Sequence, residues 1–197
     1  MKLVKWALCC AVLFVGVELA EAQNRPASPR GEASTQVGAD FDQWIVVDYG
    51  RPILRGRTGI FGSGESYGEK LNGGAPVWRL GANKSTRIMT QTDLMFGDKK
   101  LPAGKYSMYV DLKPGNWTLI ISEHGAKNNY RDDIDGLWGS YNYTDDKDVL
   151  RAPMMVDGVE VGVDQLTISF IDVSATGGTL AIFWGNTMAA TSFTVAN

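Results

Sequence analysis

Cysteine and histidine are nearly missing from this chain of 197 residues, which contains two cysteines and one histidine. Both cysteines, Cys9 and Cys10, lie near the N-terminus, so the remainder of the chain cannot form a disulfide. A zinc site needs three or four nitrogen or sulfur ligands, which this composition does not supply. We therefore expect a domain that is held together by its core alone.

An excess of positive charge is missing as well. The net charge is −3 at pH 7, from 19 Lys and Arg against 22 Asp and Glu. Domains that bind nucleic acid or anionic lipid carry clustered basic residues. The sequence therefore predicts neither a nucleic-acid partner nor a membrane partner.

The one long apolar run lies at the N-terminus. Two lysines precede an apolar stretch from Trp6 to Val17, and Ala20-Glu21-Ala22 then supplies small residues at the end of the segment. This pattern is typical of a signal peptide, and the run is short for a transmembrane helix, although a retained anchor is the alternative. We predict that residues 1–22 are removed and that the protein is periplasmic or secreted, without membrane insertion afterwards. An exported domain without disulfides is typical of bacteria.

The rest of the chain divides into a polar segment and a β-rich one. Residues 23–40 are rich in proline, serine, alanine and glycine, which predicts a flexible linker. In residues 41–197, about eleven apolar or alternating segments are bounded by turn residues, and no window has the stripe of an amphipathic helix. We predict one all-β domain, an antiparallel β-sandwich or jelly roll, with its clearest turns at 101–106 (LPAGKY) and 113–117 (KPGNW).

Two features that could carry nucleophilic catalysis lack the expected context. GESYG, residues 64–68, has the letters of a nucleophile elbow around Ser66, but no helix pattern follows it. His124 follows the strand-like NWTLIIS and is interpreted as an exposed loop residue. We assign no catalytic residue and no cofactor.

Acidic residues gather in NYRDDIDG (129–136) and TDDKD (144–148). Converging carboxylates could bind calcium, but Arg131 stands at the first ligand position of an EF-hand loop and no Glu closes that loop. The alternative is a pair of solvated turns, so we assign no metal site. Asp residues of the 132–148 region could also serve a hydrolase that acts on carbohydrate.

A set of polar and aromatic residues forms the candidate ligand-binding site: Arg79, Asn83, Trp138, Tyr141, Asp148 and Arg151. Arginine and aspartate at strand positions are costly to bury unless they are paired. Aromatic rings supply stacking area for a small ligand or a sugar, and the polar groups orient it. The alternative is an internal salt bridge between Arg79 and Asp148, with Trp78 and Trp138 filling the core.

Two segments are long enough to be specific, VWRLGANKST (77–86) and WGSYNYTDDKDVLR (138–151). Together with LPAGKYSMYV, NWTLII, LTISF and TLAIFWGNT, they make the chain resemble, over about residues 45–195, the bacterial family called domain of unknown function 2911. This resemblance implies an exported β-rich domain and brings no established reaction. The chain departs from the family pattern at Lys84 and in the insert 126–137.

These observations predict a non-catalytic binding or scaffolding module of the cell envelope, whose partner is a glycan, a peptide or an envelope protein. The hydrolase is the alternative function. Asp148 facing a second carboxylate across a cleft would favour the hydrolase. Asp148 held by an arginine would favour the binding module.

Overall fold

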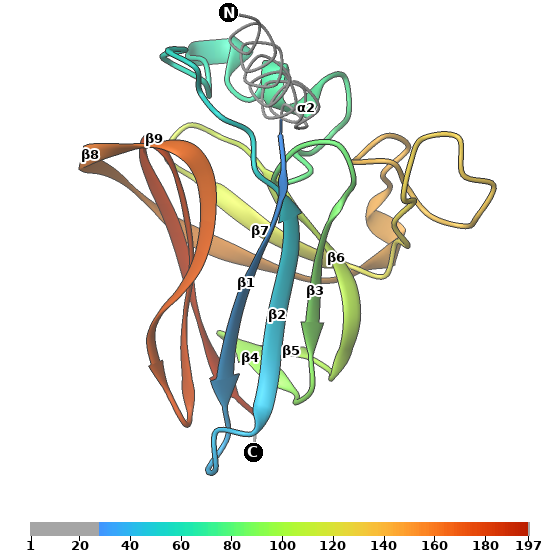
Figure 1. Cartoon of the computed structure of the whole chain (residues 1–197), viewed down its shortest axis with the longest axis vertical. Coiled ribbons are helices and arrows are strands. Elements are labelled where there is room, and N and C mark those ends of the chain that lie inside the picture. The colour runs from blue at the N-terminus through green and yellow to red at the C-terminus, as the bar shows by residue number, and fades with distance from the viewer. Residues whose placement is uncertain (1–27, 197) are drawn as a thin grey trace, which may run out of the picture.

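The computed structural model describes residues 28–196, so the predicted signal peptide and residues 23–27 lie outside the described part. Short helices occur in this range, but the strands dominate (Figure 1). The elements in chain order are β1 (Arg30–Val37), β2 (Gln43–Gly50), the 3-10 helix η1 (Gly64–Ser66), α2 (Glu69–Asn72), β3 (Thr86–Thr90), β4 (Leu94–Phe96), β5 (Lys99–Leu101), β6 (Gly104–Asp111), β7 (Trp117–Ser122), the 3-10 helix η2 (Asp145–Lys147), β8 (Asp148–Ser174) and β9 (Gly177–Val195).

Neighbouring strands pair antiparallel in one sheet with the order β1-β2-β3-β6-β7-β8-β9-β4-β5. The predicted all-β antiparallel fold is therefore confirmed. The turns predicted at 101–106 and 113–117 connect β5 to β6 and β6 to β7. Gly115 in the second turn has a φ of +67°, a conformation that glycine adopts without steric cost.

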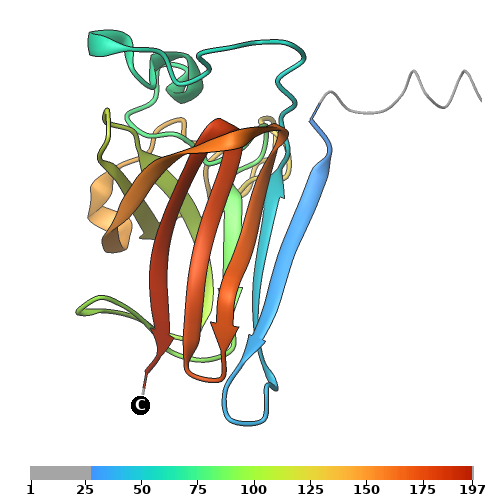
Figure 2. The same cartoon turned by 90° about the vertical axis from the view of Figure 1, so that its left-hand side faces the viewer.

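The long strand β8 bends the sheet into two layers. Its first part, from Asp148 to Met154, pairs with β7, and its later part, from Met155 to Ser174, pairs with β9. Register shifts near Gly158 and Val163 mark bulges, which bend a strand and increase its twist. Figure 2 shows the layer of β8 and β9 in front of the layer that contains β2, β3 and β6. The two layers are those of the predicted sandwich, but one continuous sheet builds them.

Hydrogen bonds also join the layers just beyond the end of β2. The Leu54 amide donates to the Asp164 carbonyl at 2.8 Å, and the Leu166 amide donates to the Pro52 carbonyl at 2.9 Å. The Ile168 amide donates to the Tyr49 hydroxyl at 3.0 Å. These bonds satisfy backbone groups of β8 that β9 does not reach, so the bent sheet closes on itself at this point.

The core between the layers contains a cluster of large aromatic rings. Trp78, Trp117 and Trp184 are buried, and the ring centroid of Trp78 lies 6.1 Å from that of each of the other two, with Phe61 against all three. The indole nitrogen of Trp117 donates to the Tyr67 hydroxyl at 2.9 Å. Burying a side chain of this size stabilises the fold by about 2 to 3 kcal/mol, so this cluster is a main source of stability.

The prediction of a flexible linker over residues 23–40 is wrong for its second half. Residues Arg30–Val37 form β1, which pairs with β2 along its whole length, from Arg30 opposite Gly50 to Val37 opposite Gln43. The segment has few apolar residues, but backbone hydrogen bonds need none, and Val37 is fully buried in the core. Residues 23–27 lie outside the described residues, so the linker stays a prediction there.

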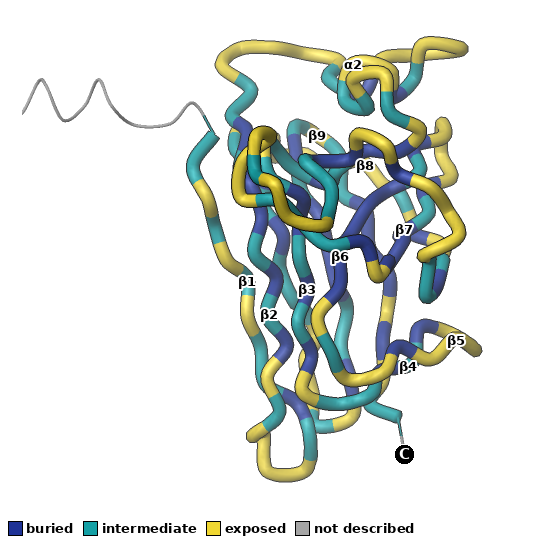
Figure 3. Tube along the Cα trace, turned by 90° about the vertical axis from the view of Figure 1, so that its right-hand side faces the viewer, coloured by how far each residue is buried: buried dark blue, intermediate teal, exposed yellow. Residues whose placement is uncertain are grey.

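The loop between β7 and β8, residues 123–147, lies beside the sheet on the side away from β9 (Figure 1). Figure 3 shows that buried residues gather in β6 and β7, while the connecting loops are largely exposed. We call residues 123–147 the β7–β8 loop. In the described part of the chain, no helix is long and apolar enough to cross a membrane.

Candidate ligand-binding site

The β7–β8 loop covers the outer face of β6 and β7, which points away from the main core. Tyr109 of β6 and Ile120 of β7 are fully buried there, and they pack with Tyr143 of the loop and with Val77. The rings of Tyr109 and Tyr143 meet edge to face with their centroids 5.0 Å apart. The loop therefore has a small core of its own, which fixes its path over the sheet.

The two sequence segments 77–86 and 138–151 meet at this loop, which contains residues 138–147 of the second segment. The hydroxyl of Ser85 donates to the Gly139 carbonyl at 2.6 Å and approaches the Leu137 carbonyl at 3.2 Å. Asn83 has a left-handed φ of +64°, which asparagine tolerates better than most residues. A turn in the first segment thus holds the backbone of the second.

Arg79 lies between Gly139 and Tyr141. Its Nη1 donates to the Asn83 carbonyl at 3.0 Å, and its guanidinium carbon lies 5.0 Å from the centre of the Tyr141 ring. A Cβ atom at Gly139 would collide with this guanidinium, so Arg79 would have to shift if residue 139 carried a side chain. Asn83 contributes to the site through its backbone carbonyl, because its side chain is exposed and makes no hydrogen bond within residues 28–196.

Asp148, Arg151 and Tyr143 form a second group. Arg151 Nε donates to Asp148 Oδ2 at 2.9 Å, Arg151 Nη2 donates to the Tyr143 hydroxyl at 2.8 Å, and this hydroxyl donates to Asp148 Oδ2 at 2.7 Å. Burial, followed by the hydrogen bond to Asp148, raises the pKa of Tyr143 above its ordinary value of 10.0. Oδ1 of Asp148 is buried and has no hydrogen-bond partner among the described residues. Arg151 is therefore the cation that pairs with Asp148.

The structure divides the predicted site into these two groups. Within residues 28–196, Asp148 pairs with Arg151, and Arg79 forms no ion pair. The alternative of an Arg79–Asp148 salt bridge is therefore wrong. Trp78 fills the main core as that alternative expected, whereas Trp138 does not belong to the buried core.

Arg87 and His124 are important residues of this region that sequence reasoning missed or placed wrongly. The sequence predicted an exposed His124, but this residue is buried, and its Nε2 lies 2.9 Å from the Thr144 carbonyl oxygen. Arg87 Nη1 donates to the His124 carbonyl and to the Ser107 hydroxyl, both at 2.8 Å. Burial lowers the pKa of Arg87. An arginine between the core-facing Thr86 and Ile88 was a signal that could have been noticed, since it must point to the outer face of β3.

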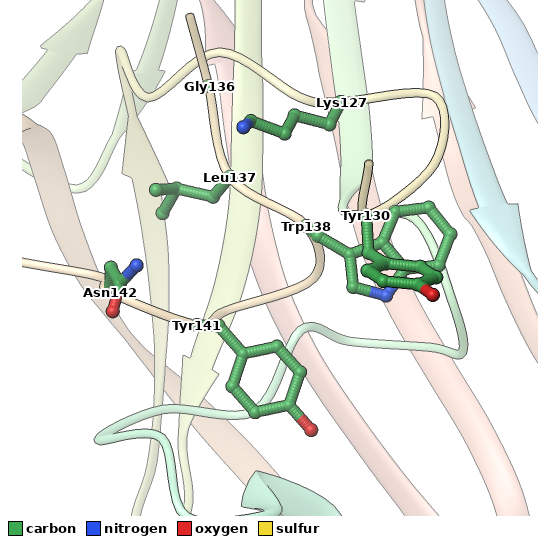
Figure 4. A pocket seen from close by; sticks show the side chains of 7 residues that line it. All are labelled: Lys127, Tyr130, Gly136, Leu137, Trp138, Tyr141 and Asn142. Atoms are coloured by element: carbon green, nitrogen blue, oxygen red, sulfur yellow. The ribbon is translucent and has the colours of Figure 1, made fainter. Parts of the chain in front are cut away.

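The β7–β8 loop encloses an open cleft of about 420 Å³, which we call the loop cleft (Figure 4). Two limbs of the loop supply its walls, and three aromatic side chains are among the lining residues. The lining residues are Lys127, Tyr130, Gly136, Leu137, Trp138, Tyr141 and Asn142. Two residues of the predicted site, Trp138 and Tyr141, thus lie in the cleft, and Arg79 reaches it through its contact with Tyr141.

The acidic residues do not gather into one centre. Asp132 accepts hydrogen bonds from the Asn128 amide at 2.7 Å, from the Asn129 amide at 3.0 Å and from the Asn129 side chain. Asp111 and Asp145 line a separate hollow of about 350 Å³ beside Arg151, but Asp111 also pairs with Lys113 at 3.3 Å. Among residues 28–196 no group of three or more acidic or histidine side chains is placed to hold a metal ion. The Ser66 hydroxyl donates to the Ser63 carbonyl at 3.0 Å and forms no hydrogen bond with His124, both residues lying within the described range.

Comparison with known proteins identifies the family and nothing more specific. Neither a curated protein nor a solved structure matches this chain. A family model described as protein of unknown function, DUF2911, matches residues 28–193, a range that includes the loop cleft and both groups of polar residues. The resemblance seen in the sequence is thereby confirmed, and the chain belongs to the DUF2911 family.

Proposed function

We propose that the protein is a non-catalytic binding module of the cell envelope and that it recognises a saccharide in the loop cleft. The observation that carries this proposal is the set of aromatic rings, Tyr130, Trp138 and Tyr141, that line one open concavity. Tyr130 is 62% exposed and Tyr141 is 45% exposed. Leaving such rings in water is unfavourable, and the flat C–H face of a pyranose is suited to cover them.

Polar groups at the cleft are suited to orient a sugar. Asn142 and Lys127 line the same cleft as the aromatic rings, and they offer donors and an acceptor to hydroxyl groups. Asn142 has a left-handed φ of +62°, a conformation that fixes the local path of the loop. A few polar groups among aromatic walls are typical of small-ligand sites.

The bonding of Asp148 favours binding over hydrolysis. A glycosidase needs two carboxylates on either side of the scissile bond. Asp148 instead uses Oδ2 to hold Tyr143 and Arg151, and Asp132 uses both oxygens to hold its own loop. These carboxylates stabilise the loop that forms the cleft, so a bound glycan should be released uncleaved.

The location in the cell envelope is the second part of the proposal. It rests on the N-terminal pattern of residues 1–22, which lies outside the described residues. The test is the N-terminal mass of the protein recovered from cells that express the full chain. A mature protein that begins at Gln23 in the exported fraction is the expected result, and an intact N-terminus in the cytosol would contradict this part.

The binding proposal is tested on an array of immobilised glycans with the protein expressed as the full chain. Trp138→Ala should weaken binding about 30-fold, because a central aromatic anchor contributes about 2 kcal/mol. Trp44→Ala is the matched control, since Trp44 is 41% exposed but belongs to β2 and does not line the cleft. It should bind like the parent.

Three results would overturn the proposal. Binding to no glycan would contradict a saccharide ligand and turn attention to peptides and proteins. Equal losses for Trp138→Ala and Trp44→Ala would contradict the loop cleft as the site. If the protein cleaves the bound glycan and the Asp148→Asn variant does not, the result would favour the hydrolase.

A further inference from the structure

The aromatic rings of the loop cleft are accompanied by cations. The guanidinium of Arg79 lies 5.0 Å from the centre of the Tyr141 ring, and that of Arg131 lies 5.1 Å from the centre of the Tyr130 ring. Lys127 is itself a lining residue. One positive side chain therefore lines the cleft and two more contact its tyrosine rings, in a protein whose net charge is −3.

The acidic residues nearest in sequence do not neutralise these cations in the described structure. The carboxylate of Asp132 accepts hydrogen bonds from the backbone amides of Asn128 and Asn129 and from the side chain of Asn129. Asp133 and Asp135 are exposed, and neither lines the cleft. Within residues 28–196, none of Arg79, Lys127 and Arg131 forms an ion pair.

The donors of Arg79 are only partly used. Nη1 is bonded to the Asn83 carbonyl, whereas Nε and Nη2 have no acceptor in the part of the chain that the structure describes. The guanidinium is nevertheless held in place by the Asn83 carbonyl and by its contacts with Gly139 and Tyr141. A fixed planar group with free donors suits a planar carboxylate, and a guanidinium on one face of a tyrosine leaves the other face for a sugar ring.

We propose that the loop cleft selects a negatively charged saccharide over its neutral counterpart. This inference rests on the proposed saccharide-binding function and adds the ligand class. The aromatic rings supply the stacking surface that any pyranose uses, while Lys127 and Arg79 recognise the acidic group. A carboxylate, as in a uronic acid, and a sulfate share this chemistry, and both belong in the test.

The experiment measures binding of the protein, expressed as the full chain, to oligogalacturonate, to the same oligosaccharide after reduction of its carboxyl groups to alcohols, and to a sulfated galactan oligosaccharide. These probes are preceded by an array that holds neutral, carboxylated and sulfated glycans. We expect array binding to be stronger for acidic than for neutral glycans and the acidic form to bind about tenfold more tightly than its reduced form. The preference should shrink as the ionic strength is raised from about 0.05 M to about 0.5 M.

Lys127→Gln isolates the charge, because it removes the cation and keeps a side chain of similar length. It should weaken binding of the acidic glycan about threefold and leave binding of a neutral glycan unchanged. Lys84→Gln is the matched control, since Lys84 is bonded to Asn128 at 2.8 Å and does not line the cleft. It should reproduce the parent.

The outcomes separate this inference from the function on which it rests. Tryptophan-dependent binding of neutral and acidic glycans with equal affinity would overturn the charge selectivity and leave saccharide binding intact. Binding of no glycan would overturn both. A preference for sulfated over carboxylated glycans would assign the acidic group as sulfate, and the reverse preference would assign it as carboxylate; both results support the inference.

Discussion

Arg151 places its Nε 2.9 Å from Oδ2 of Asp148, three residues earlier in β8, and this bond engages the one carboxylate of the predicted site. The other arginine of that site, Arg79, stacks on Tyr141 instead. The predicted residues thus act as two units. Asp148 and Arg151 anchor the β7–β8 loop to the strand that follows it, whereas Arg79 shapes the loop cleft.

The anchoring role predicts that Arg151→Ala destabilises the protein. The Asp148 side chain is 9% exposed and would lose its cation, so the free energy of unfolding should fall by about 2 kcal/mol. This value is below that of a fully buried pair, because Arg151 is 37% exposed and water screens part of the interaction. Urea unfolding at neutral pH measures the change.

The matched control for Arg151→Ala is Arg30→Ala. Arg30 pairs with Asp48 at 2.6 Å, but their side chains are 35% and 46% exposed. Removing this surface pair should cost less than about 1 kcal/mol. Equal losses in the two variants would contradict a special role for Asp148 and Arg151.

The buried tyrosines predict a loss of stability in alkali. Burial raises the pKa values of Tyr109 and Tyr143 above the ordinary 10.0, so the unfolded chain releases these protons at lower pH than the folded protein. Their contribution is complete below pH 10 and is lost as the pH rises beyond it, by up to about 1.4 kcal/mol per pH unit for each group. Urea unfolding from about pH 9 to about pH 11 measures this slope.

Tyr143→Phe tests the source of the alkaline slope. The variant has no phenol at this position, so its free energy of unfolding should fall less steeply above pH 10 than that of the parent. The difference in slope should be at most the contribution of one tyrosine. An unchanged slope would mean that Tyr143 does not contribute to it.

Gly139→Ala should destabilise the loop for two reasons. Gly139 has a φ of +65°, which costs an L-residue about 1 kcal/mol, and the added methyl group would collide with the guanidinium of Arg79. Gly97→Ala is the control, because Gly97 has a φ of +63° with no atom near the added methyl group. A loss at position 139 that exceeds the loss at position 97 by about 1 kcal/mol or more is expected from urea unfolding. Equal losses would mean that Arg79 moves aside freely.

The Trp117–Tyr67 hydrogen bond predicts that Tyr67→Phe is destabilising. The indole N–H of Trp117 is inside the core and would lose its acceptor at 2.9 Å, which should cost about 1 to 2 kcal/mol. Tyr130→Phe is the control, since that hydroxyl is bonded to an exposed arginine, and its loss should have little effect on unfolding. Identical melting of Tyr67→Phe and the parent would show that Trp117 finds another partner.

The strands of the chain could be predicted because apolar and polar residues alternate along short segments. In β6 the residues Met108 and Val110 enter the main core while Ser107 and Tyr109 point to the other face, as a period of two requires. Strand lengths were less predictable. The sequence segments 148–156 and 164–173 are separated by Asp and Gly, which are typical of a turn, yet both belong to β8, because the strand stays paired with β9 through register shifts near Gly158 and Val163.

The site could be predicted only in part. Trp138 and Tyr141 were identified because they precede Asp148 and Arg151 in one segment and could supply stacking area for a ligand, and both line the loop cleft. Gly139 and Arg87 were missed, since each matters through a contact with a residue far away in sequence. The partner of Asp148 was left open for the same reason, because side-chain direction at the start of β8 decides between Arg79 and Arg151.

The sequence by itself determined the all-β class, the positions of the tight turns and the family, because alternation, glycine and proline act over a few residues. The tertiary structure decided that β1 joins the sheet, that β8 bends it into two layers, and that Asp148 pairs with Arg151. It also decided which aromatic residues share a cleft with Lys127 and which of their rings Arg79 and Arg131 contact. These outcomes depend on which distant segments contact one another, and those contacts are set by how the whole apolar core is buried.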